Sequence, residues 1–591
     1  MFLLRNRNIK DNFTRLREKF LPSGKSISLA VSGLLFMTLS SCVADKLDKE
    51  DEPDPVFPEE KEEVYYISIE VTTPSDTGTR SDTDNSKPGD STDETEPGTA
   101  DETKITSASI FLCSSDDKIV VKLIADEEIP VPANGKTLLK AEVNKDKLNE
   151  LAELAGKETR IYIVANETES FIGDHGFKGD VTAGKASFIV SDLDAYPLGK
   201  FGTSGHIMPL SNAKQYVIDR LPIEGITSNS TLYAKTKAIK TLFTRASENL
   251  NWWDINNVID LERSVARIEF KDADRTSSTT PFPATPYVYP IKDMEVKLEL
   301  FSMQMFNVNP ESYLFRHTNR GDAKKAGSAN ATQLFGVEKD NTETDKIGTY
   351  NWIATPGWQY NSGWGKSNSD YLNKLTINED DEIFEIVNGS ATSTEALISI
   401  ETLKSHITAT ASNPPSSDGY MPWCYVTENT LPSIDLMEPV DEDGELLAAT
   451  YATGVAFKFL VLDKDGKKPL EYSTMKENYP SEVVNSITSQ QAMEEHWITI
   501  TDPNGNWVDV KPEGGKYYLT YIACIVHNEN ASKDTDANFA PMYYAVVRNN
   551  TYQMSIKSVS SLPNPKDPKS LYLQLDINVK PWVVRDNEIE F

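Results

Sequence analysis

The sequence predicts an all-β protein built from β-sandwiches. Short stretches in which apolar and polar residues alternate recur along the chain, as expected for strands with one buried face. Turn dipeptides separate such stretches at Asp443-Gly444, Asp465-Gly466 and Asn504-Gly505. Helical periodicity is rare and is confined to residues 145–154 and 489–495. Many short strands joined by Gly-, Pro- and Asn-containing turns are typical of sandwiches.

Length and charge limit the possible organisation and partners. A chain of 591 residues exceeds one ordinary core, so we expect at least two domains. It carries 59 Lys and Arg against 90 Asp and Glu, for a net charge of −31. Since phosphate-binding surfaces need an excess of cations, this balance argues against nucleic acid and against a polybasic membrane patch.

Histidine and cysteine usage predicts neither a metal site nor a disulfide framework. The six histidines lie far apart, with no pair at metal-ligand spacing. A disulfide framework would need many more than four cysteines in a chain of this length. Three of them, Cys113, Cys424 and Cys524, lie in apolar, strand-like surroundings, which predicts buried thiols.

The N-terminal region predicts export as a lipoprotein. An apolar run at 27–39 follows several basic residues and is too short to span a bilayer, so residues 1–41 are expected to be a signal peptide. The run ends in Leu-Ser-Ser-Cys42, the pattern of a lipobox whose cysteine receives the lipid (diacylglycerol, with palmitate as the typical acyl chain). The alternative is an ordinary signal peptide with a chance cysteine. Residues 43–63 are acidic and contain proline, which predicts a solvated tether.

A strand and a protease site follow the tether. Residues 64–72 alternate, and four residues share the apolar face: Tyr65, Ile67, Ile69 and Val71. Arg80 then lies among Gly, Ser and Thr residues, where an Arg-specific protease would cut before Ser81. We therefore expect residues 42–80 to be a propeptide. The alternative is that Arg80 is an incidental linker residue.

The body of the chain carries the remaining strand patterns. In the first half they fall at residues 107–112, 118–124, 160–165 and 265–270. In the second half they fall at residues 294–301, 303–307, 455–462, 517–526, 543–547 and 552–559. The stretches at 107–112 and 118–124 flank a turn at Ser115-Asp116-Asp117 and predict a hairpin. A polar, proline-containing stretch at 272–290 is the expected boundary between domains at 81–280 and 281–562.

The last strand pattern follows a proline-rich hinge at 563–568. Its apolar series is Leu571, Leu573, Leu575, Ile577 and Val579, and Trp582 continues it beyond Pro581. A strand detached in this way either folds back on its own domain or pairs with another chain. Residues 563–591 are therefore expected to be a hinge and a donor strand, with an ordinary final strand of the second sandwich as the alternative.

No pattern indicates catalysis or a cofactor. The chain lacks GxSxG, HExxH and P-loop sequences, and Tyr425, Glu428 and His527 show no partner arrangement. Residues 463–466 (DKDG) lack the following ligands of a calcium loop and are expected to form a hairpin turn. Three loop tryptophans, Trp352, Trp358 and Trp364, either form an aromatic ligand-binding surface or pack onto a sheet.

Several short strings together resemble a known family. They are found at 39–42 (LSSC), 65–71 with 78–80, 161–166 (IYIVAN), 261–268 (LERSVARI), 307–314 (NVNPESYL), 427–430 (TENT), 546–552 (VVRNNTY) and 579–582 (VKPW). In this order they resemble the type V fimbrillins, also called FimA-like or minor-fimbrium-like subunits, which are lipoprotein-precursor pilins of Gram-negative anaerobes.

The resemblance implies two transthyretin-like β-sandwich domains and export to the outer membrane through lipid. It further implies that an Arg-specific protease removes the first strand, after which the C-terminal strand of another subunit fills the freed groove and the chains polymerise into a fimbrium. Because this chain carries both strands, a shaft subunit with a role in adhesion or biofilm is the leading hypothesis. A tip adhesin or glycan-binding surface lipoprotein is the alternative, and a surface hydrolase is a third hypothesis.

Overall fold

In the computed structural model, the described residues fall in many short segments. They are residues 64–72, 96–98, 102, 104–125, 136–166, 185–187, 210–212, 216–218, 225–227, 229–245, 251–271, 287–291, 294, 296–309, 311–322, 332–334, 349–353, 355, 373–378, 383–387, 398–399, 420–430, 451–470, 498–501, 507–510, 512–527, 544–559, 562–563 and 574–584. The expected lipidation site Cys42 and the expected cut between Arg80 and Ser81 lie outside them. Residues Glu63–Phe591 form one compact unit, to which every described residue belongs.

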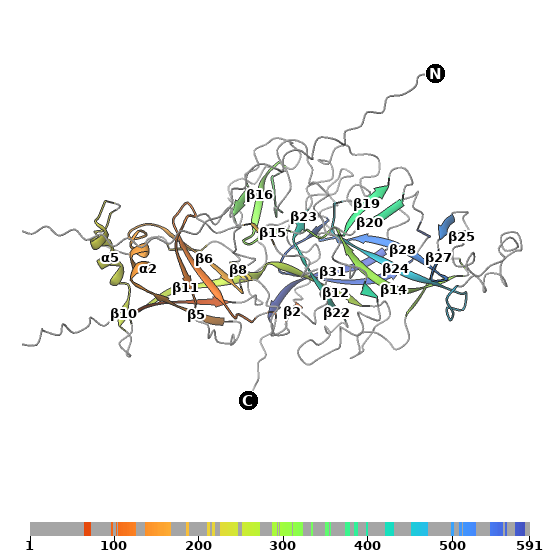
Figure 1. Cartoon of the computed structure of the whole chain (residues 1–591), viewed down its shortest axis with the longest axis horizontal. Helices are drawn as coiled ribbons and strands as arrows, with labels where there is room; N and C mark the ends of the chain where they lie inside the picture. The colour runs from red at the N-terminus through yellow and green to blue at the C-terminus, as the bar shows by residue number, and fades with distance from the viewer. Residues whose placement is uncertain are drawn as a thin grey trace, which may run out of the picture. The chain divides into compact units, whose positions relative to one another are not determined.

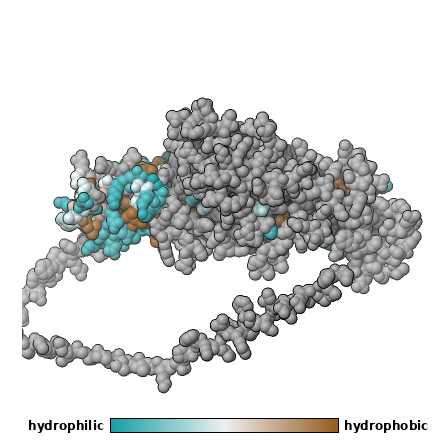
Figure 2. All heavy atoms as spheres, turned by 90° about the horizontal axis from the view of Figure 1, so that it is seen from above, coloured by the Kyte–Doolittle hydropathy of each residue, from teal (hydrophilic) through white to brown (hydrophobic). Residues whose placement is uncertain are grey.

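The all-β prediction is confirmed, and two helices occur among the described residues. The helix α2 (Lys145–Ala152) was expected; Asn144 caps it by accepting from the amide of Lys147 at 2.9 Å. The expected helix at 489–495 lies outside the described residues. The helix α5 (Leu232–Lys240) was missed because it buries only Ile239 and so lacks an amphipathic pattern. Its Leu232 and Tyr233 are exposed, and Figure 2 shows mainly hydrophilic residues near α2 and α5, with a few hydrophobic ones between them.

The first core is enclosed by one sheet, whose central path runs in the order β4-β3-β6-β8-β11-β1-β5. Its members are β1 (Tyr65–Thr72), β3 (Ala108–Cys113), β4 (Ile119–Ile124), β5 (Lys136–Val143), β6 (Thr159–Ala165), β8 (Leu210–Asn212), β9 (Tyr216–Ile218), β10 (Thr244–Arg245) and β11 (Asn251–Arg263). β9 pairs with β6, and β10 with β11. A bridge between Ala125 and Ala141 joins the two ends of the path, so the sheet curls round its core. β3 and β4 form the expected hairpin, in whose turn Asp117 has a φ of 62°.

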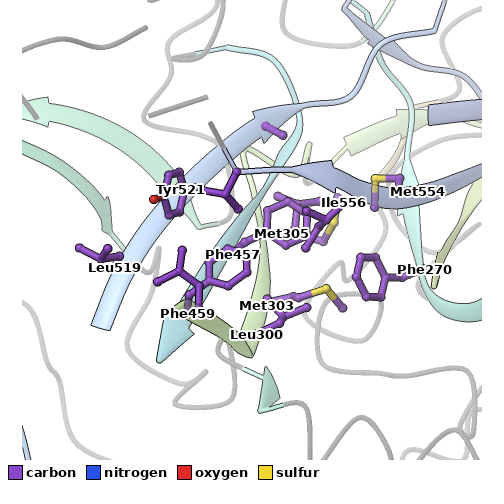
Figure 3. Close-up of a cluster of buried hydrophobic side chains, with 14 of the residues drawn as sticks. Phe270, Leu300, Met303, Met305, Phe457, Phe459, Leu519, Tyr521, Met554 and Ile556 are labelled. Carbon is purple, nitrogen blue, oxygen red and sulfur yellow. The ribbon is translucent and has the colours of Figure 1, made fainter. Parts of the chain in front are cut away.

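The second core lies between two sheets. The five-stranded sheet has the order β2 (Glu96–Gly98), β31 (Gln574–Val584), β30 (Asn550–Ser558), β12 (Val265–Lys271) and β22 (Met421–Thr427). The six-stranded sheet has the order β13 (Val288–Pro290), β14 (Lys297–Phe306), β24 (Gly454–Leu462), β28 (Lys516–Cys524) and β27 (Pro512–Glu513), with β21 (Ile398–Ser399) pairing β14. Figure 3 shows side chains of both sheets meeting, and the rings of Phe270 and Phe457 lie 6.2 Å apart.

Short strand pairs and one three-stranded sheet complete the described part. They are β15 (Glu311–Tyr313) with β7 (Lys185–Ser187), β17 (Thr332–Leu334) with β16 (His317–Asp322) and β18 (Thr349–Ile353), β19 (Lys374–Asn378) with β20 (Ile383–Val387), β23 (Asn429–Thr430) with β29 (Ala545–Val546), and β25 (Ile498–Thr501) with β26 (Trp507–Val510).

Two sequence-based boundaries differ from the structure. The expected strands at 294–301 and 303–307 are one strand, β14, whose register with β24 shifts between Leu300 and Ser302. Such an irregularity interrupts the alternation on which the prediction depended. The chain leaves the first core after β11 and enters the second core at Val265, the first residue of β12. The change of core therefore comes before the expected boundary at 280, because a polar stretch identifies a surface segment and not core membership.

Replacing Phe457 with Ala is expected to destabilise the second core. The side chain is fully buried, so its removal leaves a cavity that costs about 3–5 kcal/mol of unfolding free energy. Phe301→Ala is the matched control, because Phe301 is 41% exposed on a strand of the same sheet. Urea unfolding followed by circular dichroism measures both. Equal losses for the two variants would contradict this assignment of the core.

Candidate functional site

The first strand, β1, is an interior strand of its sheet. It pairs in parallel with β11, from Tyr65 opposite Asn251 to Thr72 opposite Asp260. On its other side it pairs antiparallel with β5 along its whole length. Backbone hydrogen bonds therefore hold β1 on both sides, and its departure would open a slot between β11 and β5. We call the space between these two strands the β1 slot.

The inward face of β1 belongs to the first core. As expected from the sequence, Tyr65, Ile67, Ile69 and Val71 are all buried in it. Fully burying an aliphatic side chain contributes roughly 1.5–3 kcal/mol, so the three aliphatic residues of this face contribute roughly 4.5–9 kcal/mol before entropic costs. The Tyr65 ring also packs edge-on against Phe243 at 5.1 Å. Without β1, the first core would lie open along the slot.

The outward face of β1 makes four specific contacts. Its aromatic and charged members are Tyr66, which stacks on Trp252 at 4.8 Å, and Glu70, which pairs with Lys136 at 3.1 Å. The other two residues of this face donate hydrogen bonds to aspartates of β11. The Ser68 hydroxyl donates to Asp254, and the Thr72 hydroxyl donates to Asp260 at 2.6 Å. Tyr216 donates to the other carboxylate oxygen of Asp260 at 2.7 Å, and burial raises the pKa of Tyr216. β11 therefore presents aspartates that require hydrogen-bond donors in the slot.

The chain connections of β1 are unusual for an interior strand. Its partner β11 begins at Asn251, far along the sequence, so no hairpin joins the two strands. The residues before β1 are the acidic stretch at 43–63, so the chain connects β1 to the other strands only through the residues that follow Thr72. A cut at Arg80 would therefore leave β1 held by non-covalent contacts alone.

The C-terminal strand β31 lies in the second sandwich, as the folded-back alternative predicts. It pairs antiparallel with β30 from Gln574 to Pro581, which places Leu575, Ile577 and Val579 in register with three core residues of β30. Trp582 is in register with Glu96 of the short strand β2. In Figure 1, β31 appears with β12 and β22. The other two expected donor positions, Leu571 and Leu573, lie outside the described residues.

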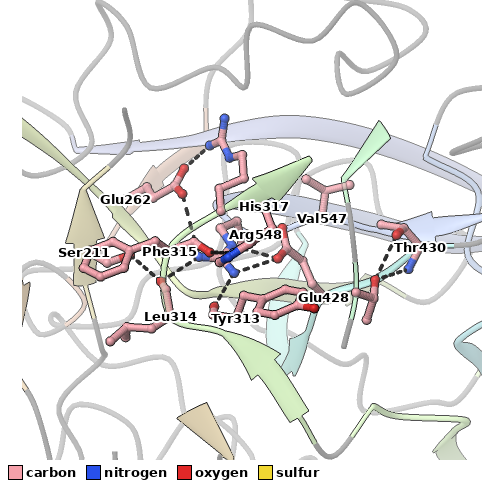
Figure 4. Close-up of polar contacts among 12 residues, drawn as sticks. Ser211, Glu262, Tyr313, Leu314, Phe315, His317, Glu428, Thr430, Val547 and Arg548 are labelled. Atoms are coloured by element: carbon pink, nitrogen blue, oxygen red, sulfur yellow. Dashed lines mark hydrogen bonds and ion pairs between the residues drawn. The ribbon is translucent and has the colours of Figure 1, made fainter. Parts of the chain in front are cut away.

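A buried charged network links the two cores around Arg548 (Figure 4). The Arg548 guanidinium lies 2.7 Å from the Glu428 carboxylate in the second sandwich. It also lies 3.8 Å from Glu262, at the end of β11, and Glu262 pairs in turn with Arg316. The carbonyl of Leu314 accepts from Arg548 at 2.9 Å and from Ser211 of β8 at 2.7 Å. Elements of both cores therefore share one set of ion pairs and hydrogen bonds.

A second buried cluster surrounds Glu102. Arg267 of β12 approaches its carboxylate at 3.0 Å, and the Tyr425 hydroxyl donates to it. Burial raises the pKa of Tyr425 well above its usual value, so this hydroxyl stays protonated. The Nε of Arg263 donates to the Glu102 carbonyl. Burial disfavours the charged guanidinium and lowers the pKa of Arg263 to about 9. Because Glu102 follows Arg80 in the chain, the segment after the expected cut is anchored to the body.

Four of the strings that resemble fimbrillins meet in these two clusters. They contain, in chain order, Glu262 with Arg263 and Arg267, Tyr313 with Leu314, Glu428, and Arg548 with Asn549. The sequence contains the strings but does not predict their shared location, because residues that contact each other in these clusters, such as Arg263 and Asn549, are 286 residues apart. Charged residues inside strand-like apolar strings could have indicated these buried clusters, since charges are buried only when they are paired. Tyr425 and Glu428 thus gain partners, as does His527, whose Nδ1 lies 2.8 Å from the Tyr552 hydroxyl.

The remaining candidate residues have structural explanations or lie outside the described residues. Cys113, Cys424 and Cys524 are buried, as expected. Residues 463–466 form the expected turn, closed by the Gly466 amide donating to the Asp463 carbonyl at 2.9 Å. The Asp463 carboxylate accepts from the amide of Lys467, and this bond is the main cause of its lowered pKa. Trp352 lies in β18, whereas Trp358 and Trp364 fall outside the described residues. Within the described segments, no group of His, Cys, Asp or Glu could hold a metal ion, and no helix is long and apolar enough to cross a membrane.

Comparison with known proteins adds a family match at the C-terminal end. Residues 512–588 match the family model described as major fimbrial subunit protein type IV, fimbrillin, C-terminal. This stretch begins at β27 and includes β30 and β31. No curated protein sequence matches the chain significantly.

Several solved structures are loosely similar over most of the chain. A candidate cell adhesion protein from Parabacteroides distasonis ATCC 8503 is 13% identical, with 88% of this chain and 99% of that chain covered and a TM-score of 0.40. A fimbrillin (fimA) from Porphyromonas gingivalis W83 is 13% identical, with 88% and 98% covered and a TM-score of 0.34. The tip fimbrial protein Mfa3 from the same species, with a C-terminal truncation, is 9% identical, with 88% and 100% covered and a TM-score of 0.28.

The family match adds to the likeness that the short sequence strings indicate. The chain is fimbrillin-like, as the sequence strings indicate, although the matched description reads type IV and the strings resemble the type V group. The match supports a role as a fimbrial subunit or adhesin in a cell-surface fimbrium, together with other fimbrial subunits. The matched family is one of structural fimbrial subunits.

Replacing Glu428 with Gln is expected to destabilise the junction between the cores. The change leaves the buried Arg548 guanidinium without its nearest carboxylate, and breaking a buried ion pair in this way costs about 3–5 kcal/mol of unfolding free energy. Glu513→Gln is the control, because the Glu513 carboxylate pairs with Lys458 at the surface, where such pairs contribute about 1 kcal/mol or less. Urea unfolding of both variants decides the question. A Glu428→Gln loss no larger than that of the control would show that the network is dispensable.

Proposed function

We propose that the chain is a structural subunit of a fimbrial shaft that polymerises by strand exchange after proteolytic removal of β1. The observation that carries this proposal is the position of β1, which is a buried interior strand covalently continuous with the body only through the segment that contains Arg80. A permanent interior strand has no need of a cleavable connection.

Loss of β1 creates a strong demand for another strand. The vacated slot exposes part of the first core together with the unpaired backbone groups of two strands, β11 and β5. An edge of this kind pairs with any strand that matches it. A strand that enters the slot gains hydrogen bonds on both sides and buries its apolar face, so the resulting contact between subunits would be slow to reverse.

The C-terminal strand of a second copy is the proposed occupant. Among the described strands, β31 pairs with β30 along most of its length, and β2 covers only three residues on its other side. Transfer into the β1 slot of a neighbour exchanges this one-sided pairing for pairing on two sides. The proline-rich hinge at 563–568 provides the chain length for the strand to leave its domain.

The expected export route fits the same scheme. We propose that lipid on Cys42 holds the precursor at the outer membrane while β1 completes the fold, and that an Arg-specific maturation protease cuts between Arg80 and Ser81. The tether and β1 then leave together, and the body joins the fimbrium on the cell surface. The order of apolar run, lipobox cysteine, acidic tether, strand and arginine in the sequence supports this route.

Replacing Arg80 with Ala is expected to arrest the protein as a lipid-linked precursor without polymer. Lys87→Ala is the control, because Lys87 precedes a proline and is a poor site for the same class of protease. The N-terminal residue of protein recovered from cells and the polymer ladder on a gel measure both steps. Recovery of Arg80→Ala protein in normal polymers would exclude the proposed trigger.

A peptide with the sequence of residues 569–580 is expected to block polymerisation of the cleaved protein. It carries the apolar series of the donor strand and competes for the β1 slot, so polymer length should fall as peptide concentration rises. A control peptide with Leu573→Asp and Ile577→Asp should have no effect, since charges would face the core. Size-exclusion chromatography measures the result, and polymer lengths unaffected by either peptide would contradict donor-strand assembly.

A further inference from the structure

The eight residues of β1 have a chemical copy at the C-terminal end of the chain. β1 reads YYISIEVT from residue 65 to 72, and residues 571–578 read LYLQLDIN. The two sequences align without a gap and in the same direction. The apolar, inward positions of β1 coincide with Leu571, Leu573, Leu575 and Ile577. Apolar alternation alone would allow either direction, so the outward positions must decide between them.

The first outward position is aromatic in both segments. The Tyr66 ring stacks on Trp252 with an angle of 26° between the planes, and Lys140 of β5 lies 5.4 Å from the centre of the same Trp252 ring system. In the alignment Tyr572 takes the position of Tyr66. A tyrosine there reproduces the stacked pair, whose geometry contributes beyond the area that it buries.

The second and fourth outward positions carry hydrogen-bond donors in both segments. In β1 these are the hydroxyl groups that donate to Asp254 and Asp260 of β11. In the alignment Gln574 and Asn578 take these places, and both have side-chain amides that donate. The two aspartates would therefore keep charge-assisted hydrogen bonds after the exchange.

The third outward position is a carboxylate in both segments. Glu70 pairs with Lys136 of β5 at 3.1 Å, and Asp576 takes its place in the alignment. The cation left behind when β1 departs would thus meet a carboxylate again. This arrangement also keeps the negative charge of Asp576 at a distance from the aspartates of β11.

Other placements of the same segment lose these contacts. One alternative is the reversed direction with Val579 at the position of Tyr65, which also keeps four apolar residues inward. It brings Asp576 to the place of Ser68, against Asp254. Moving the segment by two residues in the forward direction, with Leu573 at the position of Tyr65, creates the same carboxylate pair. A reversed register with Ile577 at that position puts a carboxylate on the Trp252 ring and a tyrosine beside Lys136. Like charges in direct contact are destabilising, which disfavours the first two placements. The third placement loses both the aromatic stack on Trp252 and the ion pair with Lys136.

We infer that residues 571–578 of a second copy enter the β1 slot in the same direction as β1, position for position with residues 65–72. This inference rests on the strand exchange proposed above and specifies its register and polarity. The donor runs parallel to β11 and antiparallel to β5. Its hinge lies at the end of the slot beside Phe243 and α5, where Lys240 lies 5.3 Å from the Tyr65 ring centre.

Cysteine pairs across β5 and the donor strand test the direction. In β5, Glu142 is opposite Tyr66 and Lys136 is opposite Thr72. The inferred register therefore places Tyr572 opposite Glu142 and Asn578 opposite Lys136. Directly opposed residues in a sheet are close enough for a disulfide. Chains that carry Glu142→Cys with Tyr572→Cys, or Lys136→Cys with Asn578→Cys, should give a covalent ladder on a non-reducing gel after cleavage and mild oxidation.

The crossed pairs are the matched controls. Glu142→Cys with Asn578→Cys and Lys136→Cys with Tyr572→Cys use the same four substitutions and should give no ladder, while each single substitution reports any reaction with the three buried cysteines. A ladder from the crossed pairs alone would overturn the inferred direction, and polymers without a ladder from any pair would overturn the register. Absence of polymer in the unsubstituted, cleaved protein would instead contradict the proposed function itself.

Discussion

Two-sided pairing of β1 is the constraint on which the first domain depends. The strand closes the gap between β11 and β5 and completes the first core with Ile67 and Ile69. An interior strand cannot be lost without exposing both apolar side chains and the backbone groups of two neighbours. The same property that makes β1 indispensable to the fold makes its place attractive to a replacement strand.

The second sandwich provides a contrast in how a strand is held. β31 is joined to the body by the chain and, among the described strands, pairs with β30 along most of its length and with the short β2 at its end. β1 pairs on both sides but has no covalent link that would survive a cut at Arg80. The fold thus contains one strand with many contacts and a connection that is expected to be cut, and another with fewer contacts and no expected cut. This difference favours movement of β31 toward a vacant slot.

The junction between the cores has a separate basis. Arg548 and Glu428 from the second sandwich are buried with Glu262 of the first sheet, and Glu102 forms a similar cluster with Arg267. Buried charges of this kind are stable only when every partner is in place, because an unpaired charge is costly to desolvate. The network therefore ties the two cores together independently of β1, and it anchors the segment that follows the expected cut.

The sequence by itself determined part of the strands, because alternation in a segment such as 65–72 depends only on neighbouring residues. It also determined the helix α2, the β3–β4 hairpin and the turn at 463–466. It did not predict β5, β11 or β22, two of which flank β1. Local patterns did not predict the weakly amphipathic helix α5. They also did not predict that the chain passes from the first core to the second at Ser264, before the expected boundary. Only the tertiary structure decided that β1 is interior, that β31 folds back beside β30, and that Glu262, Glu428 and Arg548 meet. The reason is physical: strand order and buried ion pairs join residues far apart in the chain, and local patterns carry no information about which distant partner closes each contact.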